Sequence, residues 1–166
     1  DAPTDASLHL AEGQTALRRG HVARAHECAM LALRDHGADA GPALQRLAGR
    51  FPIASLSNGN ADLHRIGLGE YFVATVTARA VGVAKPHPRI FERAVACLGL
   101  PAAQVAHVGD DPLLDVQGAQ RAGLVAVWLN RSGAAWPLPR PPHIEIADLG
   151  ARELSVDGLA RCEGGD

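Results

Sequence analysis

Short apolar runs alternate with amphipathic stretches through most of this chain, from Pro52 to Ile146. Continuous apolar runs are typical of buried strands, whereas apolar residues spaced three and four apart predict helices. We expect strands at 53–56, 72–77, 105–108, 124–129 and 143–146, and helices at 88–98 and 112–122. Strands that alternate with helices of this length predict βα units and therefore an α/β fold with a doubly wound parallel sheet.

The first part of the chain has a different pattern. Between Ser7 and His36 apolar residues recur at helical spacing, and Gly37 is placed to end the run. We therefore expect helices in this segment, divided near Gly20. Another helix is expected to begin at Pro42, because proline is favoured at a first helical position and one apolar stripe follows it.

Composition narrows the class of protein. The chain has 166 residues, 47% of them hydrophobic, and a net charge of −2, which is typical of one soluble globular domain. This balance excludes the basic footprint of a protein that binds nucleic acid or a membrane surface. The three cysteines form no CxxC pair, and we expect reduced thiols in a cytoplasmic protein. No apolar run approaches the ~20 residues of a membrane span, and the eight histidines lack metal-ligand spacing.

Two polar turns follow strands of the expected sheet. They are Ser57-Asn58-Gly59 and Gly109-Asp110-Asp111. Ligands of open α/β sheets bind beyond the carboxyl ends of the strands, where both turns should lie. The Ser57 hydroxyl and the Asn58 amide could hold an anion, with Gly59 allowing close approach of the backbone. The alternative for Ser57 is an ordinary turn or helix cap.

The second turn carries several carboxylates. Asp111 before Pro112 predicts an N-cap and a first helical residue. Asp110 projects from the strand end, and Asp115 lies near the first turn of the helix. Paired carboxylates at a strand end suit Mg²⁺, which prefers a few carboxylates with water and phosphate oxygens. The alternative for Asp115 is an acid placed in a first turn by the helix dipole.

Lys85 is the only lysine of the chain. The other residues among the 16 Lys and Arg are all arginine. Lysine offers a compact ammonium, whereas arginine offers a rigid planar fork. A small site that sets one positive charge against a phosphate oxygen favours the ammonium. The alternative is a surface lysine kept by chance. Nearby, we expect His107 to be a packed, hydrogen-bonded histidine, and Trp128 and Trp136 to be packing residues.

Taken in order, the serine after an apolar strand, the pair Lys85-Pro86 and the run from Gly109 to Gly123 resemble the haloacid dehalogenase-like (HAD) hydrolase superfamily, in its second, third and fourth motifs. The resemblance implies a Rossmann-like sheet and a Mg²⁺-dependent phosphatase acting on a small phosphorylated substrate. It assigns phosphate binding to Ser57, Asn58 and Lys85. It assigns Mg²⁺ to Asp110, with Asp111 as a secondary candidate. It makes Lys85 and Asp115 catalytic residues, Asp115 orienting the lysine or a metal-bound water.

The same resemblance predicts a division of the chain. Residues 1–40 would be a fragment of a helical cap, 41–161 the α/β core and 162–166 a disordered tail. Metal-free haloacid dehalogenases carry a Ser-Asn type fourth motif, whereas Gly109-Asp110 is the phosphatase version. The stretches at 57–62 and 127–131 are most similar to bacterial phosphatases of flavin mononucleotide and its ribityl-phosphate precursor.

The family's first motif, an apolar strand ending in Asp-x-Asp-x-Thr, has no counterpart here. Its first aspartate is the nucleophile and its second the general acid/base. Asp1 and Asp5 follow no apolar strand. The sheet would lack its central strand, leaving unpaired backbone groups on both neighbours. Two interpretations stay open: part of a longer phosphatase whose nucleophile lies outside this chain, or a non-catalytic phosphate-binding or interaction protein. By either one, the chain as given should not turn over.

Overall fold

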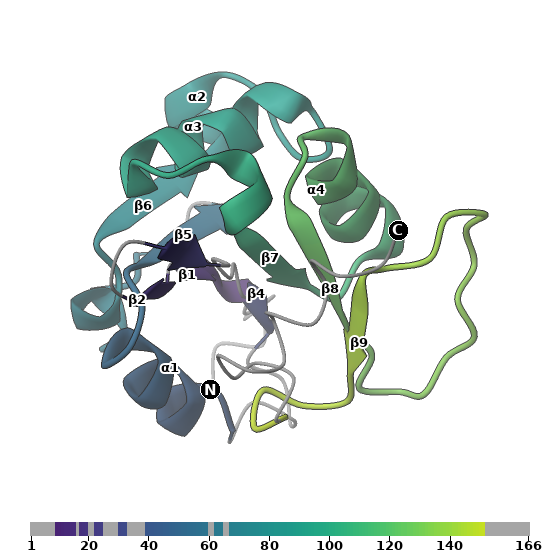
Figure 1. Ribbon diagram of the computed structural model, residues 1–166, viewed down its shortest axis with the longest axis horizontal. Coiled ribbons are helices and arrows are strands. Elements are labelled where there is room, and N and C mark those ends of the chain that lie inside the picture. Colours follow the sequence, from purple (N-terminus) through teal and green to yellow (C-terminus); the bar gives the residue numbers. More distant parts are fainter. Residues whose placement is uncertain are drawn as a thin grey trace, which may run out of the picture.

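The computed structural model describes residues 39–59, 62–64 and 67–151, together with four strands nearer the N-terminus (Figure 1). Those four strands are β1 (His9–Thr15), β2 (Leu17–Arg19), β3 (Val22–Arg24) and β4 (Met30–Ala32). The remaining strands are β5 (Ile53–Ser57), β6 (Ala74–Thr77), β7 (Ala106–Gly109), β8 (Val125–Leu129) and β9 (Ile144–Ile146). The α-helices are α1 (Ala40–Ala48), α2 (Ala78–Val81), α3 (Pro88–Leu98) and α4 (Gly118–Arg121). Shorter helical turns are η2 (Gly69–Tyr71) and η3 (Ala102–Gln104), and the π-helix η4 (Pro112–Gln117) leads into α4.

One sheet organises the molecule, with the strand order β6-β5-β1-β7-β8-β9 and β4 beside β1. The pairs β5–β6, β7–β8 and β8–β9 are parallel. The α/β, Rossmann-like fold expected from the sequence is therefore confirmed, in a sheet that is mixed because β1 runs antiparallel to both of its neighbours. Since β5 and β7 are both antiparallel to β1, their carboxyl ends lie at the same edge.

Helices cover both faces of this sheet. On one face, Leu44 and Leu47 of α1 pack in a cluster that includes Val108 of β7. On the other, Phe91 of α3 belongs to a cluster with Leu56 of β5. Figure 1 shows α2, α3 and α4 together, apart from α1. Burial on both faces explains the continuous apolar runs, because each successive strand residue points to the opposite face and finds a cover there.

The prediction of helices between Ser7 and His36 was wrong for the segments that the structure describes there. Those segments are the strands β1 to β4. The reason lies in the sheet. β1 fills the position between β5 and β7, pairing Gly13 with Ser55 and Gln14 with His107. Two buried strands offer backbone donors and acceptors on both sides of that position, and tertiary pairing overrides local helical periodicity. A strand from the predicted cap fragment thus lies in the core sheet, and the tail at 162–166 lies outside the described residues.

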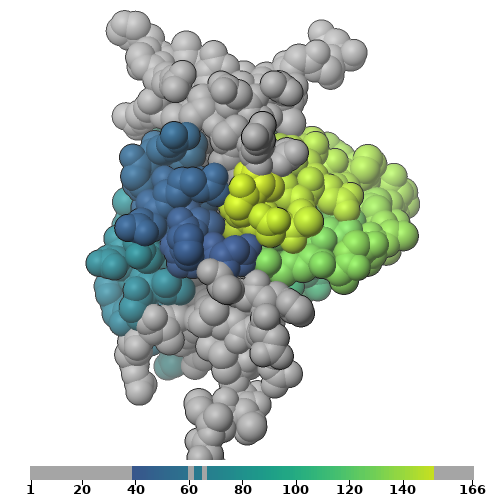
Figure 2. Space-filling model, turned by 90° about the horizontal axis from the view of Figure 1, so that it is seen from below, coloured from purple at the N-terminus to yellow at the C-terminus, as the bar shows by residue number. Residues whose placement is uncertain are grey.

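One salt bridge and two hydrogen bonds with the main chain connect the two ends of α1 to segments far along the chain. One guanidinium nitrogen of Arg131 donates to both carboxylate oxygens of Asp39, at 2.9 and 3.0 Å. The Leu149 amide donates to Asp39 at 2.8 Å, and Arg46 donates to the Leu149 carbonyl at 2.7 Å. Figure 2 shows the α1 segment in blue against the C-terminal described segment in yellow. Within the described residues, no helix is long and apolar enough to cross a membrane.

Candidate active site

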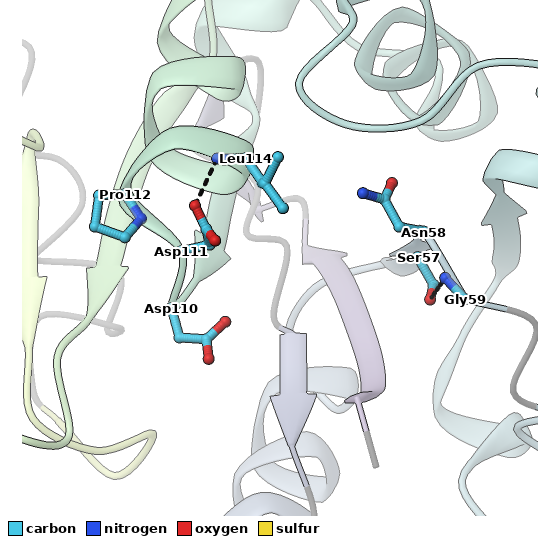
Figure 3. A pocket seen from close by; sticks show the side chains of 7 residues that line it. All are labelled: Ser57, Asn58, Gly59, Asp110, Asp111, Pro112 and Leu114. Carbon is cyan, nitrogen blue, oxygen red and sulfur yellow. Dashed lines mark hydrogen bonds between the residues drawn. The ribbon is translucent and has the colours of Figure 1, made fainter. Parts of the chain in front are cut away.

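A pocket of about 300 Å³ opens at the carboxyl ends of β5 and β7. One side is formed by Ser57, Asn58 and Gly59, which follow β5. The other is formed by the turn and first helical residues after β7, namely Asp110, Asp111, Pro112 and Leu114. Figure 3 shows these two groups facing each other across the pocket. The two polar turns singled out in the sequence are therefore brought together at the edge where open α/β sheets bind ligands.

Ser57 lies at the end of β5 in a tight polar turn. The Gly59 amide donates to the Ser57 hydroxyl oxygen at 2.9 Å, so the turn interpretation of this serine is confirmed. That bond fixes the oxygen but leaves the hydroxyl hydrogen able to donate. A Cβ built on Gly59 would meet the Ser57 hydroxyl at 3.4 Å, an ordinary contact. Packing within the protein therefore does not require glycine here, and the close approach of the Gly59 backbone to an anion stays a prediction.

The Asn58 side chain has a role that its sequence context did not reveal. Its oxygen accepts from the Lys85 amide at 2.7 Å, and its nitrogen donates to the Lys85 carbonyl at 3.2 Å. The amide therefore holds both backbone groups of Lys85 and joins the loop after β5 to the loop before α3. The side chain of Asn58 also lines the pocket. Only its main-chain amide had been assigned a part in anion binding.

Lys85 and Asp115 form a buried ion pair behind the residues that line the pocket. The ammonium lies 2.6 Å from Asp115 Oδ1, and both side chains are 0% exposed. Burial alone would raise the pKa of Asp115, but the charge of Lys85 and the hydrogen bond from His107 lower it well below its usual range. Burial lowers the pKa of Lys85, opposed by the charges of Asp115, Asp110 and Asp111. Asp115 is therefore ionised, and its charge holds the lysine in place behind the pocket lining.

Gly109 is the residue that lets Asp115 come so close to β7. A Cβ built on Gly109 would lie 2.3 Å from the Asp115 carboxyl carbon and 2.4 Å from its Cβ, distances at which something must move. The Asp111 amide then donates to the second carboxylate oxygen of Asp115 at 3.1 Å. Glycine at this position was read only as part of a motif, whereas here it makes room for the carboxylate.

Asp111 caps the helix that follows it, as expected. Its Oδ1 accepts from the amides of Leu113 and Leu114, at 2.8 and 2.7 Å, and Pro112 occupies the first helical position. The first turn is a π-helix because the amides of both Asp115 and Val116 donate to the Asp111 carbonyl. One carboxylate oxygen of Asp111 is thus engaged in the cap.

Asp110 is exposed and lines the pocket directly. Its main chain is held from behind, because the indole nitrogen of Trp128 donates to the Asp110 carbonyl at 3.0 Å. Trp128 also packs edge-on against Trp136, with ring centroids 4.9 Å apart. Packing was expected for both tryptophans. The bond from Trp128 to the backbone of a candidate metal ligand was not, although a buried indole usually finds an acceptor.

The carboxylates at the pocket are few for a metal site. Among the side chains that the structure describes, no group of three or more His, Cys, Asp or Glu residues is arranged to hold a metal ion. Mg²⁺ often takes one or two protein carboxylates and completes its shell with water and phosphate oxygens. Asp110 fits that need, since its carboxylate borders the pocket beside the Asp111 carboxylate. Both oxygens of Asp115 are engaged elsewhere.

The family model for haloacid dehalogenase-like hydrolases matches residues 4–123, which is most of the chain. The chain belongs to this family. Curated relatives of the chain include proteins named as phosphatases, the branch expected from the fourth motif. The Escherichia coli 5-amino-6-(5-phospho-D-ribitylamino)uracil phosphatase YigB is 36% identical over 64% of this chain. The Thermus thermophilus phosphoserine phosphatase is 36% identical over 58% of it.

Among solved structures, a 2-haloacid dehalogenase from Pseudomonas syringae pv. Tomato DC3000 is similar, with a TM-score of 0.69 and 40% identity over 75% of this chain and 53% of its own. The match confirms the HAD-like fold. The chain spans 46% of the length of the Escherichia coli relative and 41% of the Thermus one.

Proposed function

We propose that this HAD-like hydrolase is a Mg²⁺-dependent phosphomonoesterase that acts on a small phosphorylated metabolite through an aspartyl-phosphate. The nucleophilic aspartate and the acid/base aspartate would come from outside these 166 residues. The observation that carries the proposal is the pocket itself. The Ser57 hydroxyl and the exposed Asp110 carboxylate line it from the ends of two strands. Lys85, paired with the buried Asp115, is held behind this lining by the Asn58 side chain, which binds its backbone.

Each of these groups would meet one part of a phosphate ester. The Ser57 hydroxyl keeps its hydrogen for a phosphate oxygen, because its own oxygen is already fixed by Gly59. The main-chain amide of Asn58 lies in the same turn and would add a second donor. The Lys85 ammonium carries three N–H donors. It donates to Asp115 Oδ1, with Nζ 2.6 Å from that oxygen. Positive charge held in place by a fixed carboxylate needs no reorganisation when the phosphoryl group moves, which favours the transition state.

Asp110 would hold the metal, with Asp111 beside it as the second candidate. Mg²⁺ bound there would neutralise the phosphate charge. The Trp128 indole fixes the Asp110 backbone, and Asp111 is fixed by its cap bonds. The chain's contribution is therefore a rigid set of groups at one edge of the sheet, which would keep the phosphate oriented.

Hydrolysis of a generic aryl phosphate by the full-length protein tests this proposal. Release should require Mg²⁺, be abolished by a chelator and return with added Mg²⁺. Asp110→Asn should reduce activity by more than about 100-fold, because the replacement keeps the shape but removes the charge that binds the metal. A stable full-length protein that is inactive with Mg²⁺ across aryl phosphates would leave the non-catalytic phosphate-binding alternative.

Dehalogenation is a second candidate function, because the dehalogenase from Pseudomonas syringae is 40% identical in the matched region. The Gly109-Asp110 pair argues against it, since the metal-free dehalogenases carry a Ser-Asn type motif there. Halide release from 2-chloropropionate in the presence of chelator measures this activity directly. Halide release without metal, and no phosphate release with metal, would replace the phosphatase proposal by dehalogenation.

The leaving group is the finer question. Two relatives act, by their names, on a ribitylamino-uracil phosphate and on phosphoserine. We propose the ribityl-phosphate class first, because the stretches at 57–62 and 127–131 are similar to phosphatases of that class. A panel with ribityl, seryl and nucleotide phosphates, compared by kcat/KM, distinguishes them. A cytoplasmic location remains part of the proposal, and a small phosphorylated metabolite is the only partner that it requires.

A further inference from the structure

His107 contacts the same oxygen that binds the lysine. Its Nε2 lies 3.0 Å from Asp115 Oδ1, and the Lys85 ammonium lies 2.6 Å from that atom. All three side chains are buried. Asp115 therefore receives two donors at one oxygen and the Asp111 amide at the other. The imidazole is the only one of these donors that comes from the middle of a strand, where the backbone is fixed by pairing on both sides.

The protonation of His107 follows from its partner. An ionised carboxylate can only accept, so the imidazole must carry its hydrogen on Nε2. Burial lowers the pKa of His107, and the nearby charge of Lys85 lowers it further, against the pull of Asp115. The histidine is therefore neutral and has its lone pair on Nδ1. It adds a donor to Asp115 without adding a second positive charge beside Lys85.

Packing alone does not account for a histidine at this position. The Nδ1 atom is buried and has no hydrogen-bond partner among the described residues. The ring packs edge-on against Phe91, with centroids 5.1 Å apart, in surroundings that an aliphatic side chain would also fill. An unsatisfied buried nitrogen costs free energy. The polar contact that offsets this cost is the bond to Asp115.

We propose that His107 is a positioning residue for Lys85, acting through Asp115. Its Nε2–H fixes the carboxylate and shares its charge, so that the ammonium is held toward the pocket and is not drawn onto Asp115 alone. This role rests on the proposed phosphatase function. Removing the donor should weaken the hold on phosphate, because partners behind a ligating group commonly contribute about 10- to 100-fold.

Two matched substitutions in the full-length protein test the role. In His107→Gln the amide nitrogen replaces Nε2 and can still reach Asp115, whereas in His107→Asn it replaces Nδ1 and cannot. We expect His107→Asn to raise both KM and the inhibition constant of inorganic phosphate about 10-fold. His107→Gln should keep both constants close to their wild-type values. Equal phosphate inhibition constants in both variants and wild type would overturn the proposal, whatever their melting temperatures.

A spectroscopic measurement tests this inference independently of the proposed phosphatase function. The ring ¹⁵N shifts of His107 should show hydrogen on Nε2 and a lone pair on Nδ1, and Asp115→Asn should change them. The opposite tautomer would overturn the inference even in an active enzyme. If wild type shows no Mg²⁺-dependent hydrolysis and does not bind inorganic phosphate, the proposed function fails. If it is active and the two variants do not differ, only the role of His107 fails.

Discussion

The ion pair between Lys85 and Asp115 is fully enclosed by the protein. Both side chains are 0% exposed, and the loop that carries the lysine is fixed through its backbone by the Asn58 side chain. Breaking a buried pair by removing one partner leaves an uncompensated charge, which commonly costs about 3–5 kcal/mol. The survival of one lysine among arginines has a physical explanation here, since a guanidinium is larger and planar.

Lys85→Arg tests that explanation. We expect hydrolysis of aryl phosphate to fall at least about 10-fold and the free energy of unfolding to fall by about 1–3 kcal/mol, because a planar fork must enter a packed site. Urea unfolding and initial rates measure the two effects. Arg93→Lys, the reverse exchange at an exposed position of α3, is the control and should change neither. An arginine variant as active as wild type would remove the special role given to Lys85.

Gly109→Ala is a second change at this scale. The added methyl would enter the space of the Asp115 carboxyl group, so we expect about 1–3 kcal/mol of destabilisation and a loss of phosphate binding. Gly41→Ala is the matched control, since a Cβ at Gly41 of α1 meets nothing within 4 Å. That control should gain up to about 1 kcal/mol from helix propensity. Similar stabilities for the two variants would contradict the close contact at Gly109.

Residue types and spacing predicted which side chains gather at the site, but not how they bind one another. Ser57, Asp110 and Asp111 were expected at the pocket because strand ends meet at one edge. The bonds from Asn58 to the Lys85 backbone depend on how two loops meet, and no periodicity encodes that meeting. His107 was expected to be packed and hydrogen-bonded, which is confirmed, but its partner could not be read from an apolar strand.

The helix that begins after β7 delivers two of the site's carboxylates. Asp111 ends the turn and caps the π-helix η4, and Asp115 follows one turn later. The wide first turn and the Asp111 amide together set the direction of Asp115. A cap residue that borders a pocket can serve the helix, the ligand or both, and the two roles respond differently to substitution.

Asp111→Asn and Asp111→Ala separate these roles. Asparagine keeps a capping oxygen and should leave the free energy of unfolding nearly unchanged, whereas alanine should cost about 1 kcal/mol. We expect Asp111→Asn also to keep most of the Mg²⁺ affinity, because the cap engages one of its oxygens and Asp110 is the principal ligand candidate. Titration of Mg²⁺ into the phosphatase assay measures this. A loss as large as that of Asp110→Asn would make Asp111 an equal ligand.

The strands and helices after Pro52 were predictable because the sheet is covered on both faces. Such a sheet needs strands that are apolar throughout and helices that are apolar on one side. β5, β7 and β8 lie within a residue or two of the expected ranges, as do α3 and η4 with α4. The segment that contains β1 was not predictable in this way. Its helical spacing is a local property, whereas its place between β5 and β7 depends on distant backbone groups that need partners.

At the scale of the whole molecule, Asp39 joins three distant segments. It accepts from Arg131, which follows β8, and from the Leu149 amide, which follows β9. Burial would raise the pKa of Asp39, but these hydrogen bonds and the Arg131 charge lower it below its usual value. A carboxyl group whose pKa is lower in the folded state stabilises the fold above its unfolded pKa of ~3.9.

This contribution should be lost as the pH falls from about 4 through the lowered pKa of the folded protein. At pH 7 we expect Asp39→Asn to lower the free energy of unfolding by about 1 kcal/mol, since the pair is partly exposed. The difference between variant and wild type should shrink as the pH falls through that lowered pKa, below which Asp39 is neutral in the folded and the unfolded state. Urea unfolding at several pH values measures it. A difference that stays constant with pH would assign the effect to packing.

The indole of Trp128 gives the site an optical reporter that needs no turnover. The chain contains two tryptophans, and they contact each other edge-on while Trp128 donates to the Asp110 carbonyl. A metal or anion that shifts the Asp110 backbone changes the field at that indole, and therefore its emission. In a Trp136→Phe background the signal would come from Trp128 alone among the tryptophans of this chain. Occupancy of the pocket could then be followed by light, even in variants that no longer hydrolyse anything.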